Sequence, residues 1–158
     1  MKYTDTLVSF REFPDEISLC INISGCQFRC PDCHSKELWE NIGEILDGRT
    51  ISMLLQQNKG ISCVGFMGGI PKEVNDLAEC IRRNKIPVKI GWYWGGTTFP
   101  TEFKLENFDY IKIGPYIKEK GPLDNPNTNQ RMYQISKMET GEFSIEDITF
   151  KFWKHGER

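Results

Sequence analysis

The sequence predicts an α/β protein whose strands are mostly parallel. Residues 16–24, 62–67 and 87–94 are each typical of a strand, and a helix is predicted over residues 71–84, between the last two. Strands that alternate with helices favour βα units and a parallel sheet. A closed eight-stranded βα barrel needs about 250 residues, whereas this chain has 158. We therefore expect one domain, residues 1–158, folded as an open, partial (βα) barrel with about five or six strands.

The longer elements follow from hydrophobic periodicity. Residues 16–24 alternate, as strands do, and one face of that strand carries Ile17, Leu19, Ile21 and Ile23. Residues 71–84 place Val74, Leu77, Ala78 and Ile81 at helical spacing, and Pro71 suits the first turn. A shorter helix is expected over residues 50–57, with Thr50 as its N-cap.

The second half of the chain gives weaker signals. Residues 109–113 are expected to form a strand that ends at Gly114, and residues 118–131, rich in Gly, Pro and Asn, are expected to form a loop. Two terminal strands are expected at residues 131–136 and 148–153. In sheets of parallel strands the chemistry gathers at the carboxyl ends, so we look for the site there.

Composition and charge exclude several classes of function. The chain has 20 Lys and Arg against 22 Asp and Glu, so its formal net charge of −2 gives no footprint for nucleic acid. No apolar run approaches the ~20 residues that span a bilayer, and residues 1–16 are too polar for a signal peptide. We therefore expect a cytoplasmic protein, in which cysteines suit metal or redox chemistry better than disulfides.

The most informative motif holds Cys26, Cys30 and Cys33, with the spacing Cys-x3-Cys-x2-Cys. A cubane iron–sulfur cluster normally takes four protein thiolates, one for each iron. Three thiolates leave one iron open to another ligand, and an open position is where a metal site does chemistry. The motif directly follows the strand expected over residues 16–24. We therefore predict a 4Fe–4S cluster held by these three cysteines at the carboxyl end of that strand.

Two other interpretations of the three cysteines stay open. A structural zinc ion would need a fourth ligand, for which the chain offers His34, Cys20, Cys63 and Cys80. Zinc sites usually have two tightly spaced pairs of ligands, and the sequence holds no second pair. In the second interpretation the three cysteines are core residues and their spacing is accidental. Buried free cysteines behave as small apolar residues. We expect that simpler role for Cys63 and Cys80.

Several segments resemble the radical S-adenosylmethionine (SAM) enzymes, whose signature has the same cysteine spacing. Residues 62–71, SCVGFMGGIP, resemble the strand and Gly-Gly-Glu-Pro motif that cradles the amino group of SAM. Residues 34–40 look like the segment after the cluster loop in activating enzymes of glycyl radical enzymes. Residues 109–116 and 121–135, together with the short chain, resemble the anaerobic ribonucleoside-triphosphate reductase activating proteins.

This resemblance implies a fold, two cofactors and two partners. The fold is the open partial barrel of the radical SAM type, and the cofactors are a 4Fe–4S cluster and SAM. Reductive cleavage of SAM gives a 5′-deoxyadenosyl radical, which takes a hydrogen atom from a glycine of the anaerobic ribonucleotide reductase. A flavodoxin- or ferredoxin-type protein supplies the electron. The alternatives are another small radical SAM enzyme, such as a different glycyl radical activase or a carboxy-deazaguanine synthase, and a non-catalytic zinc-binding module.

The resemblance also implies which residues contact SAM. Asp32, Cys33 and His34 match positions that touch the adenine, although His34 is equally suited to a surface loop. Gly68 and Gly69 match the glycines whose missing Cβ lets backbone approach the ligand. The alternative for the two glycines is a strand-to-helix turn that needs small residues.

One position departs from the family motif. The residue after the two glycines is usually acidic, and here it is Ile70. A carboxylate contact to the SAM amino group is therefore missing unless Glu73 replaces it. Other residues are left with two roles each: Phe28 either shields the cluster or packs in the core, and the polar residues 129–131 either meet solvent or approach SAM or the partner.

Overall fold

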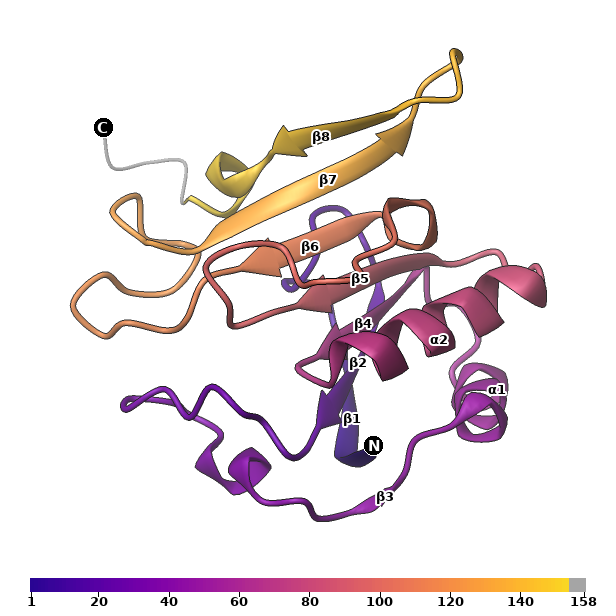
Figure 1. The fold of residues 1–158 in the computed structure, drawn as a ribbon, viewed down its shortest axis with the longest axis horizontal. Helices are drawn as coiled ribbons and strands as arrows, with labels where there is room; N and C mark the ends of the chain where they lie inside the picture. Colours follow the sequence, from indigo (N-terminus) through magenta and orange to yellow (C-terminus); the bar gives the residue numbers. More distant parts are fainter. Residues whose placement is uncertain (154–158) are drawn as a thin grey trace.

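The fold is an eight-stranded mixed sheet with two helices on one face, as seen in a computed structural model that describes residues 1–153 (Figure 1). The strand order is β3-β1-β2-β4-β5-β6-β7-β8. The four central strands are parallel, namely β2 (Ser18–Ile23), β4 (Cys63–Met67), β5 (Lys89–Tyr93) and β6 (Tyr110–Ile113). Antiparallel strands flank them, namely β1 (Lys2–Ser9), β3 (Glu44–Ile45), β7 (Arg131–Lys137) and β8 (Phe143–Asp147).

The sheet is wider than the five or six strands that we expected, and only half of its strands are parallel. The sequence analysis missed β1, β3 and β8, which are at or next to the two edges of the sheet. Edge strands are often short, polar or half solvated, so their apolar alternation is weak. Of the eight residues in β1, only Tyr3 is buried, and β8 has no buried residue.

The strand predicted at residues 148–153 is wrong. The last strand, β8, ends at Asp147, and a 3-10 helix, η3 (Thr149–Phe152), follows it. Asp147 causes the change of direction, because its Oδ1 accepts hydrogen bonds from Thr149 N at 2.9 Å and Thr149 Oγ1 at 2.6 Å. Aspartate commonly turns a chain by bonding the backbone two residues on.

Both helices form for reasons that the sequence contains. Helix α2 (Pro71–Arg83) buries the predicted apolar stripe, and Pro71 lies in its first turn. Helix α1 (Gly48–Gln57) begins two residues earlier than expected. Thr50 is not its N-cap: Asp47 holds that position, and its carboxylate accepts a hydrogen bond from Thr50 N at 2.9 Å. Asp and Thr are both good N-caps, and here the aspartate is the residue with extended backbone.

Different side chains pack on the two faces of the sheet. The face under the helices is the main core, and its strand residues include Leu19, Ile21, Val64, Phe66, Ile90, Trp92 and Ile111. On the opposite face the strand register aligns Gly65 of β4 with Gly91 of β5. Phe13, from the β1–β2 loop, packs onto this glycine pair and is fully buried. A Cβ at Gly65 would lie 2.6 Å from the Phe13 ring, and one at Gly91 would overlap it.

A polar group ties the strands together at their amino ends. The carboxylate of Glu16, only 6% exposed, accepts hydrogen bonds from Lys89, from Tyr110 Oη at 3.0 Å and from Ser62 Oγ at 2.6 Å. Burial favours a raised pKa for Glu16, but the hydrogen bonds from Lys89, Ser62 and Tyr110 outweigh it and the pKa is lowered. The hydrogen bond between Lys89 and Glu16 also raises the pKa of Lys89.

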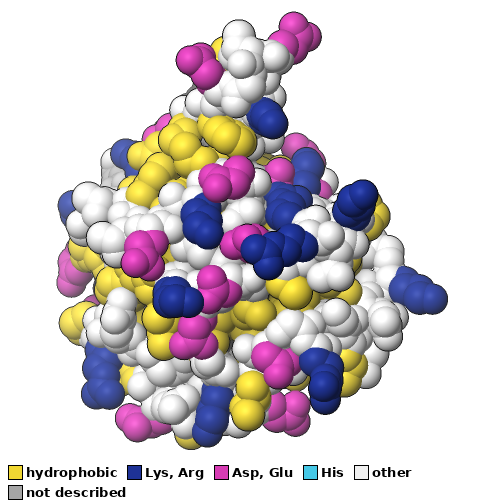
Figure 2. Space-filling view, turned by 45° about the vertical axis from the view of Figure 1, so that its right-hand side comes forward, with side chains coloured by type: hydrophobic (Ala, Val, Ile, Leu, Met, Phe, Trp, Pro, Cys, Tyr) yellow, Lys and Arg dark blue, Asp and Glu magenta, His cyan; other side chains and the backbone are white. Residues whose placement is uncertain are grey.

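On the face that Figure 2 shows, no patch of the surface carries charges of only one sign. Lys and Arg side chains alternate there with Asp and Glu, in keeping with the small net charge. Within residues 1–153, no helix combines the length and apolar character that crossing a membrane requires.

Candidate metal centre and adjoining pockets

The cysteine loop leaves the carboxyl end of β2 and folds back on a short 3-10 helix, η1 (Lys36–Trp39). Two backbone hydrogen bonds hold it there, from Gly25 N to Glu40 O at 3.0 Å and from Cys26 N to Leu38 O at 2.8 Å. A third, from Cys33 N to Cys30 O at 3.0 Å, makes a turn between the last two cysteines. The backbone therefore fixes the loop at both of its ends and inside the motif.

The three cysteines of the motif line one cavity of about 170 Å³. Its wall also contains one residue from the carboxyl end of each of three neighbouring strands, namely Met67 of β4, Tyr93 of β5 and Lys112 of β6. Strand pairing places these three residues side by side in one row. Gly68, Ser35 and Gln130 also belong to the wall. The site thus lies at the carboxyl edge of the parallel strands, where the sequence analysis expected it.

The three thiols are grouped around one space. Cys26, Cys30 and Cys33 are free and half-buried, and all three line the same cavity. In a cubane cluster each thiolate binds a different iron, whereas a structural zinc ion takes four ligand atoms. The wall of this cavity offers three thiols and, within residues 1–153, no histidine.

The other three cysteines do not line this cavity. Cys20 and Cys63 are buried in the sheet, and burial raises the pKa of both thiols, that of Cys20 to about 12. A thiol whose pKa is raised is a poor source of thiolate ligand. Cys80 lies on α2, where its sulfur is close to Gly48. Cys63 therefore has the packing role that we expected, whereas Cys80 is only half-buried and lies outside the core clusters.

Phe28, in the middle of the cysteine loop, has the core-packing role that the sequence analysis offered as one of two. It lines the cavity, and it also packs against the main core. Gly95, just past β5, provides the space, since a Cβ there would lie 2.6 Å from the Phe28 ring. Residues 92–94 are all aromatic. Trp92 and Trp94 are buried core residues, and only Tyr93 lines the cavity.

Lys112 is a cavity residue that the sequence analysis missed. It is 8% exposed, its Nζ donates a hydrogen bond to Gly114 O at 2.9 Å, and the ammonium lies 5.4 Å from the centroid of the Tyr93 ring. Burial lowers the pKa of Lys112 to about 8, and the nearby thiols of Cys30 and Cys26 act in the opposite direction. The signal was available, because a lysine interrupts the run YIKI, which is otherwise hydrophobic, one residue before the end of the strand.

The two glycines after β4 have different surroundings. Both have left-handed backbone, with φ of +93° at Gly68 and +101° at Gly69. Gly68 lines the cavity, and its carbonyl accepts a hydrogen bond from Trp92 Nε1 at 2.8 Å. At Gly69 a Cβ would lie 2.7 Å from Val74, so this glycine is required by the turn into α2. The cavity therefore includes only the first of the pair.

Neither Ile70 nor Glu73 places a carboxylate in the cavity. Ile70 is half exposed at the N-cap of α2. Glu73 forms an ion pair with the amino group of Met1, and it does not line the pocket. The carboxylate of the family motif has no replacement among the residues of this wall.

A second pocket, of about 230 Å³, adjoins the first at Cys33. It contains Asp32 and His34, together with Tyr116, Lys36 and Lys118. The rings of His34 and Tyr116 lie 5.1 Å apart at 54°. The structure thus places the three residues assigned to adenine, Asp32, Cys33 and His34, around one pocket, and it adds Tyr116, which carries an aromatic face.

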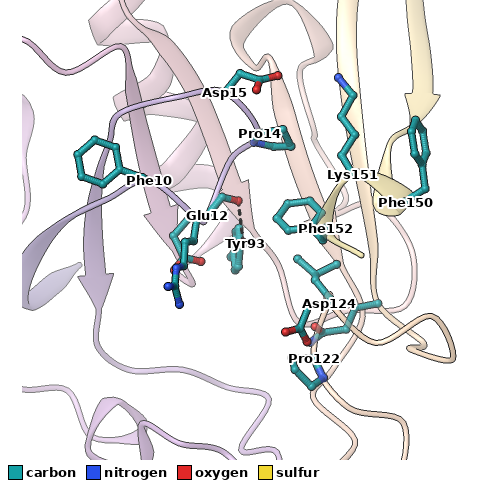
Figure 3. A pocket seen from close by; sticks show the side chains of 13 residues that line it. Phe10, Glu12, Pro14, Asp15, Tyr93, Pro122, Asp124, Phe150, Lys151 and Phe152 are labelled. Atoms are coloured by element: carbon teal, nitrogen blue, oxygen red, sulfur yellow. Dashed lines mark hydrogen bonds between the residues drawn. The ribbon is translucent and has the colours of Figure 1, made fainter. Parts of the chain in front are cut away.

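A third cavity, of about 910 Å³, holds none of the cysteines. It lies between the β1–β2 loop and the segment Phe150–Phe152, with Tyr93 at its base (Figure 3). Tyr93 Oη donates a hydrogen bond to the carbonyl of Glu12 at 2.8 Å. Tyr93 and Gln130 line this cavity and also the cysteine cavity, so the two are neighbours. The thiols place the chemistry in the smaller one.

The three loop residues 129–131 lie in different environments. Gln130 is buried and reaches both cavities. Asn129 donates a hydrogen bond to Pro115 O at 2.9 Å, and Arg131 lies 3.8 Å from the Asp147 carboxylate. Only Gln130 therefore approaches the site.

Comparison with known proteins identifies the group to which the chain is similar. A family model described as 4Fe-4S single cluster domain matches residues 17–132, which include the cysteine loop, Gly68 and Lys112. No curated protein and no solved structure matches the chain. The matched residues make up most of the 158, and they contain the whole wall of the cysteine cavity. The chain belongs to the family of 4Fe-4S single cluster domains and is an iron–sulfur protein.

Proposed function

We propose that the chain is a radical SAM activating enzyme that installs a glycyl radical on an anaerobic ribonucleoside-triphosphate reductase. The observation that carries the proposal is the cavity at the carboxyl edge of β4–β6, which gathers three thiols and Gly68. Cys26, Cys30 and Cys33 would hold a 4Fe–4S cluster, which in its reduced state would supply one electron to the SAM sulfonium. The S–C5′ bond would break to give methionine and a 5′-deoxyadenosyl radical, which would take a hydrogen atom from the partner's glycine and leave 5′-deoxyadenosine and a glycyl radical. The protein's own part is to bind, orient and exclude water.

The ligand count supports an open iron. The cavity wall supplies the sulfurs of Cys26, Cys30 and Cys33 and, within residues 1–153, no fourth cysteine and no histidine. A cluster held in this way has one iron left for an external ligand. Gly68 lines the same cavity and has no Cβ, so a ligand can approach its backbone closely.

The two adjoining pockets suit two ligands of different kinds. The cavity of about 170 Å³ contains the three thiols, which would bind the inorganic group. The neighbouring pocket offers a further 230 Å³ and the aromatic rings of His34 and Tyr116. We infer that the adenosine of SAM extends from the cluster past Cys33 into this second pocket, where the rings stack on the base.

The cavity of about 910 Å³ supports a macromolecular substrate. A glycine in a folded partner has to reach the cluster on a segment of chain, which needs a wide approach rather than a closed pocket. The cavity of about 910 Å³ meets the cysteine cavity at Tyr93 and Gln130 and is bordered by Phe10 and Phe150, both exposed. We propose that the reductase segment enters here. A flavodoxin- or ferredoxin-type protein would supply the electron, and the open partial barrel of the radical SAM type would be the fold.

The first experiment tests SAM cleavage. The chain is reconstituted anaerobically with iron and sulfide, reduced with dithionite, and assayed for 5′-deoxyadenosine with SAM. We expect turnover in the wild type and none above background in Cys26→Ala, Cys30→Ala or Cys33→Ala. Cys80→Ala is the matched control, because Cys80 lies outside the cavity. Near-normal turnover in any of the first three variants contradicts the ligand assignment.

The second experiment tests the partner. The reconstituted chain, SAM and a purified anaerobic ribonucleotide reductase are mixed, and electron paramagnetic resonance is used to look for a glycyl radical on the reductase. A radical that requires both SAM and the chain supports the proposal. SAM cleavage without such a radical would point instead to another small radical SAM enzyme.

A further inference from the structure

The cysteine cavity contains a buried cation without a carboxylate counter-ion. Lys112 is 8% exposed, and the hydrogen-bond acceptor of its Nζ is a neutral carbonyl, that of Gly114, at 2.9 Å. Among residues 1–153, no carboxylate oxygen forms an ion pair with it. A buried ammonium normally needs a partner of opposite charge, because leaving water costs several kcal/mol for each ion.

The position of Lys112 indicates where that opposite charge lies. Its neighbours in the strand row are Met67 and Tyr93, which are uncharged. The remaining wall of the cavity contains Cys26, Cys30 and Cys33. Three thiolates on a 4Fe–4S core make a net anion in both of its oxidation states, and reduction adds one further negative charge. The carboxylate of Glu12 also acts on the Lys112 ammonium, but less than the sulfurs of Cys30 and Cys26, and it lines the larger cavity and not this one. The anionic group inside this cavity that pairs with Lys112 is therefore the cluster itself.

We propose that Lys112 is the counter-charge of the cluster and that it raises the cluster's reduction potential. A fixed positive charge in a site of low dielectric stabilises the more negative state more strongly than the less negative one. Net charge and local surroundings are among the factors that set iron–sulfur potentials. Lys112 is a positioning and tuning residue in this role, and it transfers neither a proton nor an electron. The inference rests on the cluster alone, so it does not depend on SAM cleavage or on the reductase.

The test compares a charge-removing and a charge-keeping variant. Lys112→Met removes the ammonium but keeps an unbranched apolar side chain, and Lys112→Arg keeps the positive charge. Lys59→Met is the control for net charge, because Lys59 is exposed at the end of α1, away from the cavity. Each protein is reconstituted anaerobically, its iron content is measured, and its midpoint potential is determined without SAM by redox titration followed by electron paramagnetic resonance.

We expect a more negative midpoint potential in Lys112→Met, with Lys112→Arg and Lys59→Met close to the wild type. Loss of iron from Lys112→Met, with retention in Lys112→Arg and an unchanged circular dichroism spectrum, would also support the counter-charge role. An unchanged potential in Lys112→Met at equal iron content would overturn it. So would an equal shift, or an equal loss of iron, in the arginine variant. Failure of SAM cleavage in the wild type would not affect this result.

Discussion

The ring of Phe28 stands edge-on to the indole of Trp94, with 4.6 Å between the ring centroids and 86° between their planes. Phe28 belongs to the cysteine loop, whereas Trp94 follows directly on β5 and is 8% exposed. The contact therefore joins the loop that carries the thiols to the body of the sheet. Aromatic pairs of this geometry contribute about 0.5–1.5 kcal/mol beyond the area that they bury.

Replacing Phe28 should loosen the cluster loop without unfolding the protein. We expect Phe28→Ala to lower the free energy of unfolding by about 1–2 kcal/mol, less than for a fully buried ring because Phe28 is half-buried. The thiols would lose their fixed spacing, so iron per chain after reconstitution should fall by half or more. Phe10→Ala is the control, since Phe10 is 71% exposed. Full iron loading in Phe28→Ala would show that backbone hydrogen bonds alone hold the loop.

The glycine pair under Phe13 should tolerate no side chain. A methyl group at Gly91 would overlap the Phe13 ring, and forcing extra atoms into a packed core costs about 1–3 kcal/mol. We expect Gly91→Ala to lower the midpoint of urea denaturation by a corresponding amount. The double variant Gly91→Ala/Phe13→Leu should recover part of the loss, because the smaller side chain vacates the space. No recovery would mean that Gly91 is needed for backbone reasons and not for Phe13.

The Glu16 group makes the stability depend on pH. The folded state lowers the pKa of Glu16 relative to an ordinary carboxyl value of 4.5. Its contribution is therefore present above about pH 4.5 and is lost as the pH falls through the lower, folded value. We expect the free energy of unfolding, measured by urea denaturation of the chain without metal, to be about 2 kcal/mol higher in the wild type than in Glu16→Gln at pH 7. The difference should become progressively smaller below pH 4.5. The exposed Glu139→Gln should match the wild type throughout, and a difference for Glu16→Gln that is constant with pH would exclude ionisation as its cause.

Position 70 offers a test of the missing acidic residue. Ile70→Glu places a carboxylate at the N-cap of α2 on a side chain that is 51% exposed. A negative charge at a helix N-terminus adds about 0.3–1 kcal/mol of stability. If the amino group of SAM lies beside Gly68, the dissociation constant for SAM, measured by equilibrium dialysis under anaerobic conditions, should fall several-fold. Ile70→Gln separates charge from size. Weaker binding in the glutamate variant would place the amino group elsewhere.

The sequence predicted best those elements whose signal is local. The stripe of α2 and the alternation before the cysteine loop each depend on a few neighbouring side chains, and both elements form close to the predicted residues. The three cysteines share a cavity because one loop carries them. The sequence missed β1, β3 and β8, because edge strands are stabilised by pairing with distant residues and need no apolar pattern of their own.

The parts of the site that sequence could not supply come from strand register. Lys112 faces the thiols because pairing of β5 with β6 aligns it with Tyr93 at the same edge. Gly68 and Gly69 look alike in sequence, yet only the first lines the cavity, because the turn directs the second toward Val74. Thr50 and Asp47 both suit a helix N-cap, and only the backbone conformation at Asp47 decides between them.

The carboxylate of Glu16 binds the strands together at one end, and the thiols lie at the other. Losing the inorganic centre to air should therefore leave the scaffold folded, because none of the bonds that brace the amino ends passes through the iron. A chain that had lost its iron would then keep the three cysteines around their cavity, ready to take up iron and sulfide again.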